Sequence, residues 1–234
     1  MQALRMHRVV TQPRVSAHKL GHYTVANARE RRAIVKDQMR PREFAQLRYV
    51  EAREAMIDHL MDMEADGSEL FLFMEYMASG YMGSRFATQN AALCIESLSC
   101  FLQHRDPGLF KDMQRERGRE DAPPMRVAGV LVDVLPDLIV RGENRNGKAI
   151  VGALKLHLSK RQPLDEDSAQ NMASLLSVYL NQQVSRPGES VSWKHCVVWD
   201  VFAQKMFIAP RSTTNRLRVM EACCEEISFR WRAG

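Results

Sequence analysis

The stretch "PDLIVRGENRNGKAIVGALKLHLSK", residues 136–160, decides the fold. It predicts a turn, a strand, a Gly/Asn hairpin and a second strand that carries a lysine, Lys155. Lys155 shares one face of the second strand with Ala153 and His157, because side chains two residues apart point the same way. The residues between them are apolar and predict a buried face. The strand is therefore expected to have a core side and a polar side, with Lys155 on the polar one.

The rest of the chain predicts helices around this strand. Three-and-four spacing of apolar residues indicates helices over about 24–38, 41–63, 70–77 and 84–104, followed by an exposed, charged connector at 111–124. Further strands are expected at 126–135 and 138–140, which would form a meander with the Lys155 strand. A helix at 163–184, strands at 195–202 and 205–210 and a helix at 212–231 complete the chain. This order predicts an α/β fold in one compact unit, with a mainly helical region at 1–118 and an α/β core at 119–234.

Charge is unevenly distributed along the 234 residues. The formal net charge is +5, yet the first fifty residues contain eleven Lys or Arg against three acids. Such a region either contacts phosphates or forms a solvated helix face, and both alternatives remain open. The candidates for nucleic-acid contact are Arg29, Arg31, Arg32 and Lys36, together with His157 on the Lys155 strand. A structural hydrogen bond is the alternative role for His157.

Several classes of site are excluded by the motifs that the sequence lacks. It contains no GxxxxGK[ST], GxGxxG, HExxH or GxSxG, so a nucleotide-cradling loop or a zinc hydrolase is not expected. The five cysteines form no CxxC pair, and the seven histidines show no spacing that indicates a metal site. No stretch resembles a signal core or a membrane span, so we expect a cytoplasmic, bacterial protein with reduced thiols and no membrane partner. The sequence does not indicate an oligomeric state.

Pro136 and Asp137, followed by a hairpin and then by Lys155, resemble the PD-(D/E)xK motif of the restriction-endonuclease-like nuclease superfamily. The resemblance covers about residues 125–210, including the helix and hairpin after the lysine. It implies a central mixed sheet flanked by helices. It also implies that Asp137 and a second acid hold Mg²⁺ or Mn²⁺, that Lys155 orients the attacking water, and that the substrate is DNA or RNA.

The sequence departs from this motif two residues before Lys155, where Ala153 stands in place of an acid. Glu96 is the best substitute, because it lies alone in the apolar helical run "AALCIESLSCFL" at 91–102. Its alternative role is a half-exposed or arginine-paired surface acid. Asp133 and Glu143 are further substitutes. Asp200 is another, and it could instead hold a hairpin turn.

Two functions are therefore expected. The first is a metal-dependent nuclease that uses Asp137, Glu96 and Lys155, with Asp137 and Glu96 as metal ligands. The second is a catalytically inactive module that keeps the fold and binds nucleic acid or a partner protein. In a protein-interaction module the methionine-rich segments "MIDHLMDM" and "FMEYMASGYM" would form a docking surface, although such methionines also serve to fill a core.

Overall fold

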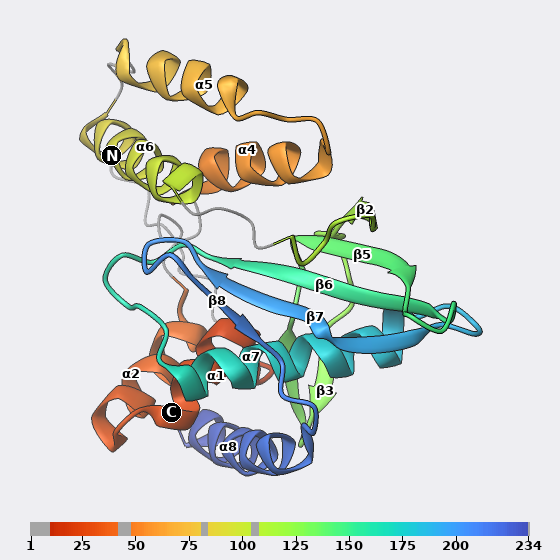
Figure 1. Cartoon of the computed structure of the whole chain (residues 1–234). Helices are drawn as coiled ribbons and strands as arrows, with labels where there is room; N and C mark the ends of the chain where they lie inside the picture. Colours follow the sequence, from red (N-terminus) through yellow and green to blue (C-terminus); the bar gives the residue numbers. More distant parts are fainter. Residues whose placement is uncertain (1–9, 42–47, 81–83, 104–107, 234) are drawn as a thin grey trace.

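A five-stranded mixed sheet forms the centre of the protein (Figure 1). The computed structural model describes residues 10–41, 48–80, 84–103 and 108–233. The sheet order is β2-β5-β6-β7-β8; only β6 and β7 run parallel to each other, and the other neighbours are antiparallel. Its strands are β2 (Gln114–Arg117), β5 (Leu138–Glu143), β6 (Ala149–His157), β7 (Ser190–Asp200) and β8 (Lys205–Ile208). The predicted α/β class and the hairpin that leads to Lys155 are confirmed.

Helices cover both faces of this sheet, as Figure 1 shows. Three helices lie on one face: α4 (Val50–Met61), α5 (Ser68–Ala78) and α6 (Arg85–Gln103). The other face is covered by α7 (Glu166–Tyr179), which continues into the π-helical turn η1 (Leu180–Val184). Below α7 lie α1 (Ala17–Val25), α2 (Ala28–Met39) and α8 (Thr214–Arg232). Among the described residues, none of these helices is long and apolar enough to cross a membrane.

Strand β6 is buried on both sides. Leu154 and Leu156 pack into the core under α4 and α6, whereas Val151 and Ala153 pack into the core around α7. The prediction that one face of this strand is polar is therefore wrong for most of its length, because α7 covers that face. The polar character is limited to the C-terminal end of β6, where Lys155 lies.

A separate three-stranded sheet packs beside α1 and α8. It has the order β1-β4-β3, with β1 (Arg14–Ser16) parallel to β4 (Val130–Asp133) and β3 (Met125–Val127) antiparallel to it. The predicted single strand at 126–135 is a hairpin of β3 and β4, because the backbone turns at Ala128 and Gly129 with positive φ angles. The predicted meander is also wrong, because these two strands belong to the second sheet. The chain leaves it at Leu135, whose φ of 42° turns the backbone before β5 begins.

The predicted helix at 24–38 is observed as α2, whereas α1, which ends at Val25, was not predicted. Asn27 forms a capping box with Glu30, which starts α2 at Ala28, two intervening residues beyond the end of α1. The predicted helix at 41–63 is observed as α4, and residues 42–47 lie outside the described residues. The C-terminal helix, the helices at 70–77 and 84–104 and the β7–β8 hairpin are observed close to their predicted positions. All five cysteines are free thiols.

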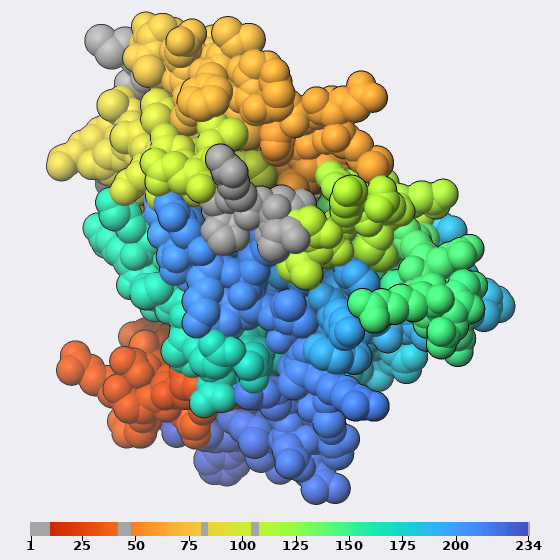
Figure 2. Space-filling model, viewed as in Figure 1, coloured from red at the N-terminus to blue at the C-terminus, as the bar shows by residue number. Residues whose placement is uncertain are grey.

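The connector at 111–124 contains the edge strand β2, which pairs with β5. The sequence predicts an exposed linker at 111–124, because the residues are charged and do not indicate strand pairing. The segment from β1 to α2 shares its core with α7 and α8. Figure 2 shows this segment in contact with the part of the chain that follows residue 118. The regions before and after residue 118 therefore share sheets and cores.

Gly152 allows β6 and β7 to approach each other at an irregular point of their register. A Cβ atom there would lie 2.4 Å from His195 Cβ and 2.5 Å from the His195 carbonyl oxygen. We therefore predict that Gly152→Ala lowers the free energy of unfolding by about 3 kcal/mol, measured by urea denaturation. Gly142→Ala on β5 is the matched control, because its Cβ would meet only the Met113 side chain at 3.4 Å. An equal effect of both substitutions would contradict the prediction.

Candidate functional site: a basic cleft at the end of strand β6

Asp137 and Lys155 meet where β5 begins and β6 ends. The Asp137 backbone N–H donates to the Leu154 carbonyl oxygen at 2.9 Å, which aligns the start of β5 with β6. Lys155 Nζ lies 3.3 Å from Asp137 Oδ1 and donates to the Leu135 carbonyl oxygen at 2.5 Å. The left-handed turn at Leu135 places this carbonyl beside Pro136. The structure therefore brings the two motif residues together on one side of the sheet.

A third residue, Arg53 on α4, completes the contacts of Asp137. Arg53 Nη1 lies 2.7 Å from Asp137 Oδ1, and the Leu156 backbone N–H donates to Asp137 Oδ2 at 2.6 Å. Both oxygens of this buried carboxylate consequently have partners. Sequence reasoning missed Arg53, because the contact depends on how α4 packs on the sheet, and no local spacing indicates it.

The charges in this cluster stabilise one another. Burial raises the pKa of Asp137, but the nearby cations Lys155 and Arg53 and the Leu156 N–H outweigh burial, so its pKa lies below the ordinary value. Burial lowers the pKa of Lys155 to about 8, although Asp137 acts in the opposite direction. At pH 7 the carboxylate is therefore ionised and the amine is mostly protonated.

The other candidate acids have different surroundings. Glu96 on α6 forms an ion pair with Lys160, with 2.5 Å between Oε1 and Nζ. Asp133 pairs with Arg14 at the surface, and Glu143 is exposed on the β5–β6 hairpin. Asp200 accepts from the backbone N–H groups of Leu164 and Ala203, and so it holds the β7–β8 turn.

The side chains around Asp137 differ from the metal ligands that the motif implies. Mg²⁺ and Mn²⁺ bind mainly to oxygen ligands, typically carboxylates and water. Here Asp137 is already in contact with two cationic side chains, the position of the second acid is the buried Ala153, and Glu96 is paired with Lys160. These residues do not fit a two-carboxylate Mg²⁺ or Mn²⁺ site, and that cofactor remains a prediction that the described contacts do not support.

A cleft of about 960 Å³ runs past Arg53 and Lys155. Its described lining contains no Asp or Glu, and His18, Tyr49 and His157 form part of its wall. Five cationic side chains line it: Arg48, Arg53, Lys155, Lys160 and Arg161. A smaller pocket of about 520 Å³ borders the same cluster and is lined by Arg53, Asp137 and Lys155 as well as residues near β2. The cleft can attract an extended anion, because its walls carry one sign of charge.

The predicted N-terminal contacts lie elsewhere. Arg31 donates to the carbonyl oxygens of Tyr23, Thr24 and Ala26 and pairs with Glu226, which fixes α2 against the end of α1 and against α8. Arg29 is exposed on α2.

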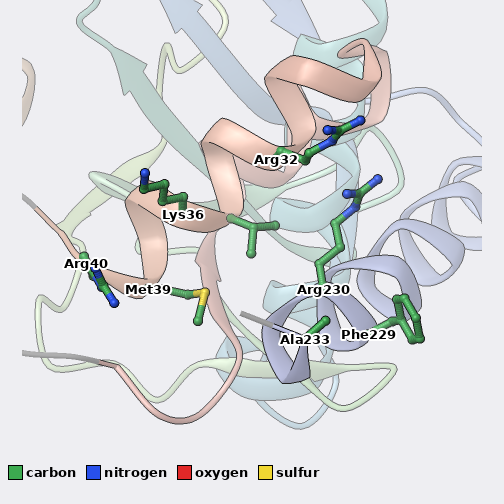
Figure 3. A pocket seen from close by; sticks show the side chains of 8 residues that line it. Arg32, Lys36, Met39, Arg40, Phe229, Arg230 and Ala233 are labelled. Atoms are coloured by element: carbon green, nitrogen blue, oxygen red, sulfur yellow. The ribbon is translucent and has the colours of Figure 1, made fainter.

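Arg32 and Lys36 line a different pocket of about 390 Å³ between α2 and α8 (Figure 3). Arg40 and Arg230 add two further cations to this pocket. It shares no lining residue with the cleft, so the α2–α8 pocket and the basic cleft are separate surfaces, and of the basic N-terminal residues Arg48 lines the cleft.

His157 has partners at both ring nitrogens. Nδ1 lies 2.9 Å from His18 Nδ1, and Nε2 lies 2.8 Å from the Gln162 carbonyl oxygen. His18, His22 and His157 form a group that could hold a metal ion. The expectation that the histidines show no metal-ligand spacing overlooked this group. The signal was present in the sequence, because His18 and His22 are four residues apart on one helix face.

The methionines of the helical layer mostly fill its core. Met61, Met74 and Met77 pack against the cluster between α4, α5 and α6. The apolar side chains that α5 exposes are instead Phe71, Leu72 and Tyr76, and the two aromatic ones are 56% and 66% exposed.

No protein-family model matches the chain, and no curated protein is similar enough to be counted as a relative. The function must therefore be argued from the site itself.

We predict that Arg53→Met destabilises the protein by about 3 kcal/mol, because it removes one of the two cations that compensate the buried Asp137 carboxylate. Chemical denaturation at pH 7 measures this loss. Arg161→Met is the matched control, since Arg161 lines the same cleft but is exposed. A loss for Arg53→Met no larger than that of the control would contradict the role assigned to this ion pair.

A second prediction concerns acid. The pKa of Asp137 is lower in the folded state than in the unfolded state. The ionised carboxylate therefore stabilises the fold above about pH 4, and this stabilisation is lost as the pH falls through the pKa of the folded state. Asp137→Asn should lower the stability at pH 7 and flatten its decline below about pH 4. Urea unfolding at a series of pH values measures this difference. Asp37→Asn, at an exposed position on α2, should leave the decline unchanged.

Proposed function

We propose that the chain is a nucleic-acid-binding module on a restriction-endonuclease-like fold, in which the Arg53 guanidinium stands where the fold's metal ion would bind. One observation carries this proposal. The cleft is lined by five cationic side chains and by no described acid, and two of these cations, Arg53 and Lys155, already neutralise the buried carboxylate of Asp137.

The order of elements supports the choice of fold. A Pro-Asp turn leads into β5, a hairpin leads to the lysine on β6, and the helix α7 and the β7–β8 hairpin follow. The mixed sheet has helices on both faces, which is the architecture that the resemblance implies. The side-by-side position of Asp137 and Lys155, 3.3 Å apart, supports it further.

The chemistry of the cleft favours the phosphodiester backbone as ligand. Arg48 and Arg161 have guanidinium groups that form paired, charge-assisted hydrogen bonds with phosphate oxygens. Lys160 shares its charge with Glu96 and so contributes less. Tyr49 offers an aromatic side chain at the cleft wall. Contacts of this kind depend on charge rather than base identity, so we expect binding with little sequence preference.

A metal-dependent nuclease is the second candidate function, and the contact between Asp137 and Lys155 is the observation that favours it. For a divalent cation to bind Asp137, the Arg53 guanidinium would have to leave Oδ1. The cation would then share the site with Lys155 and a single carboxylate. We therefore place binding before cleavage.

The proposal predicts salt-sensitive binding without cleavage. Fluorescence anisotropy with labelled single- and double-stranded DNA and RNA should show affinity that falls steeply with salt concentration. The double substitution Arg48→Glu and Arg161→Glu should weaken binding by roughly 10-fold or more and reduce the slope of log K against log salt by roughly two. The same substrates incubated with Mn²⁺ should stay intact.

The matched control is Arg145→Glu with Lys148→Glu, which changes the net charge equally on the exposed β5–β6 hairpin. This pair should leave the salt slope unchanged. Absence of binding by the unsubstituted chain, or an equal effect of the control pair, would contradict the cleft as the binding surface. Cleavage that requires both Mn²⁺ and Asp137 would establish the nuclease instead.

A further inference from the structure

Three imidazoles from two distant segments meet at the wall of the cleft. His18 and His22 lie one turn apart on α1, and His157 lies at the end of β6. The ring centres of His18 and His157 are 4.4 Å apart, and those of His18 and His22 are 4.7 Å apart. One nitrogen from each ring lies within 4.8 Å of the other two. Among the described residues this is the one such group of three or more His, Cys, Asp or Glu.

The hydrogen bonds around His157 orient one of its nitrogens toward this group. The Gln162 carbonyl oxygen, 2.8 Å from His157 Nε2, can only accept, so Nε2 carries a proton and donates it. In the neutral ring Nδ1 then has a lone pair, which accepts a hydrogen bond from His18 Nδ1 at 2.9 Å, and a metal ion would replace that hydrogen bond. A histidine that donates one N–H to a carbonyl and directs its other nitrogen inward has the arrangement of a metal ligand.

His22 supplies the second observation. Its Nε2 atom is buried and has no hydrogen-bond partner among the described residues. A buried nitrogen without a partner is unfavourable, because it has lost its contact with water and gained no replacement. A cation that binds this lone pair would remove that cost.

The protonation state of the group is compatible with metal binding. Burial, together with the neighbouring imidazoles and Lys19, lowers the pKa of His22 to about 4 and the pKa of His18 well below its ordinary value. Burial also lowers the pKa of His157, which Asp200 opposes. Neutral imidazole is the form that ligates metals.

We propose that His18, His22 and His157 form a binding site for a transition-metal ion, with Zn²⁺ as the preferred ion. Three nitrogen donors suit Zn²⁺ and do not suit Mg²⁺, so this site is distinct from the two-carboxylate site that the motif implies. The ligand nitrogens lie within 4.8 Å of one another, and those around a tetrahedral Zn²⁺ are about 3.3 Å apart, so binding requires small shifts of the imidazoles. His18 and His157 line the cleft, which leaves a fourth coordination position for water or an anion.

Metal titration of the full chain, without a polyhistidine tag and after treatment with a chelator, tests this site. Addition of Co²⁺ should produce the visible absorption of a tetrahedral site, with one ion bound per chain, and Zn²⁺ should displace it. Competition with a colorimetric indicator then gives the affinity for Zn²⁺. His22→Gln should weaken that affinity by roughly 100-fold, since loss of even an outer-shell partner costs 10- to 100-fold.

His195→Gln is the matched control, because it removes one partly buried imidazole from β7, where His195 bonds to Ser192. It should retain full affinity for Zn²⁺, and circular dichroism should show both variants folded. Failure of the folded, unsubstituted chain to bind Co²⁺ and Zn²⁺ overturns the proposal, as does an equal loss in both variants. The titration contains no nucleic acid, so its outcome is independent of the function proposed for the cleft.

Discussion

The buried carboxylate of Asp137 is the interaction on which the rest of the site depends. It connects three elements: Asp137 directly precedes β5, Arg53 belongs to α4, and Lys155 and the Leu156 N–H belong to β6. A carboxylate this buried is stable only when it is paired and hydrogen-bonded. The same contacts therefore fix the position of the helical layer over the sheet and determine which charges face the cleft.

The parts of the site that the sequence predicted are those governed by local geometry. Asp137 and Lys155 were paired in advance through the resemblance to the PD-(D/E)xK motif, and the hairpin and the two-residue period of strands are compatible with that pairing. Arg53 and Glu96 could not be assigned in the same way. Their partners are set by the packing of α4 and α6 on the sheet, which depends on contacts between residues far apart in the chain. The charge of an acid isolated in an apolar helix can be neutralised by a surface lysine as well as by a metal ion.

The fold shows the same division. Helices with caps or clear apolar spacing, such as the C-terminal helix α8, were predictable from the sequence. Strand β2 was not, because its sequence QRER is charged, and the partners that hold it, β5 by backbone pairing and Glu54 and Asp58 of α4 by ion pairs with Arg117, are distant in the chain. Strand β4 was recognised as a strand, but its sheet was not, because the turn at Leu135 that separates it from β5 has no glycine to indicate it.

The positive charge at the end of β6 explains how an anion-binding cleft and the histidine group can lie side by side. Arg53 and Lys155 together exceed the charge of Asp137, so the potential at the end of β6 favours anions and opposes a divalent cation bound mainly by electrostatic attraction. Mg²⁺ binding relies heavily on carboxylate charge, whereas Zn²⁺ gains much of its affinity from donor bonds to uncharged imidazole. A site with Ala153 at the position of the motif's second acid is therefore poorly suited to the first kind of metal and can still be suited to the second. A Zn²⁺ ion held beside the cleft would add to its positive charge and so reinforce its attraction for phosphate.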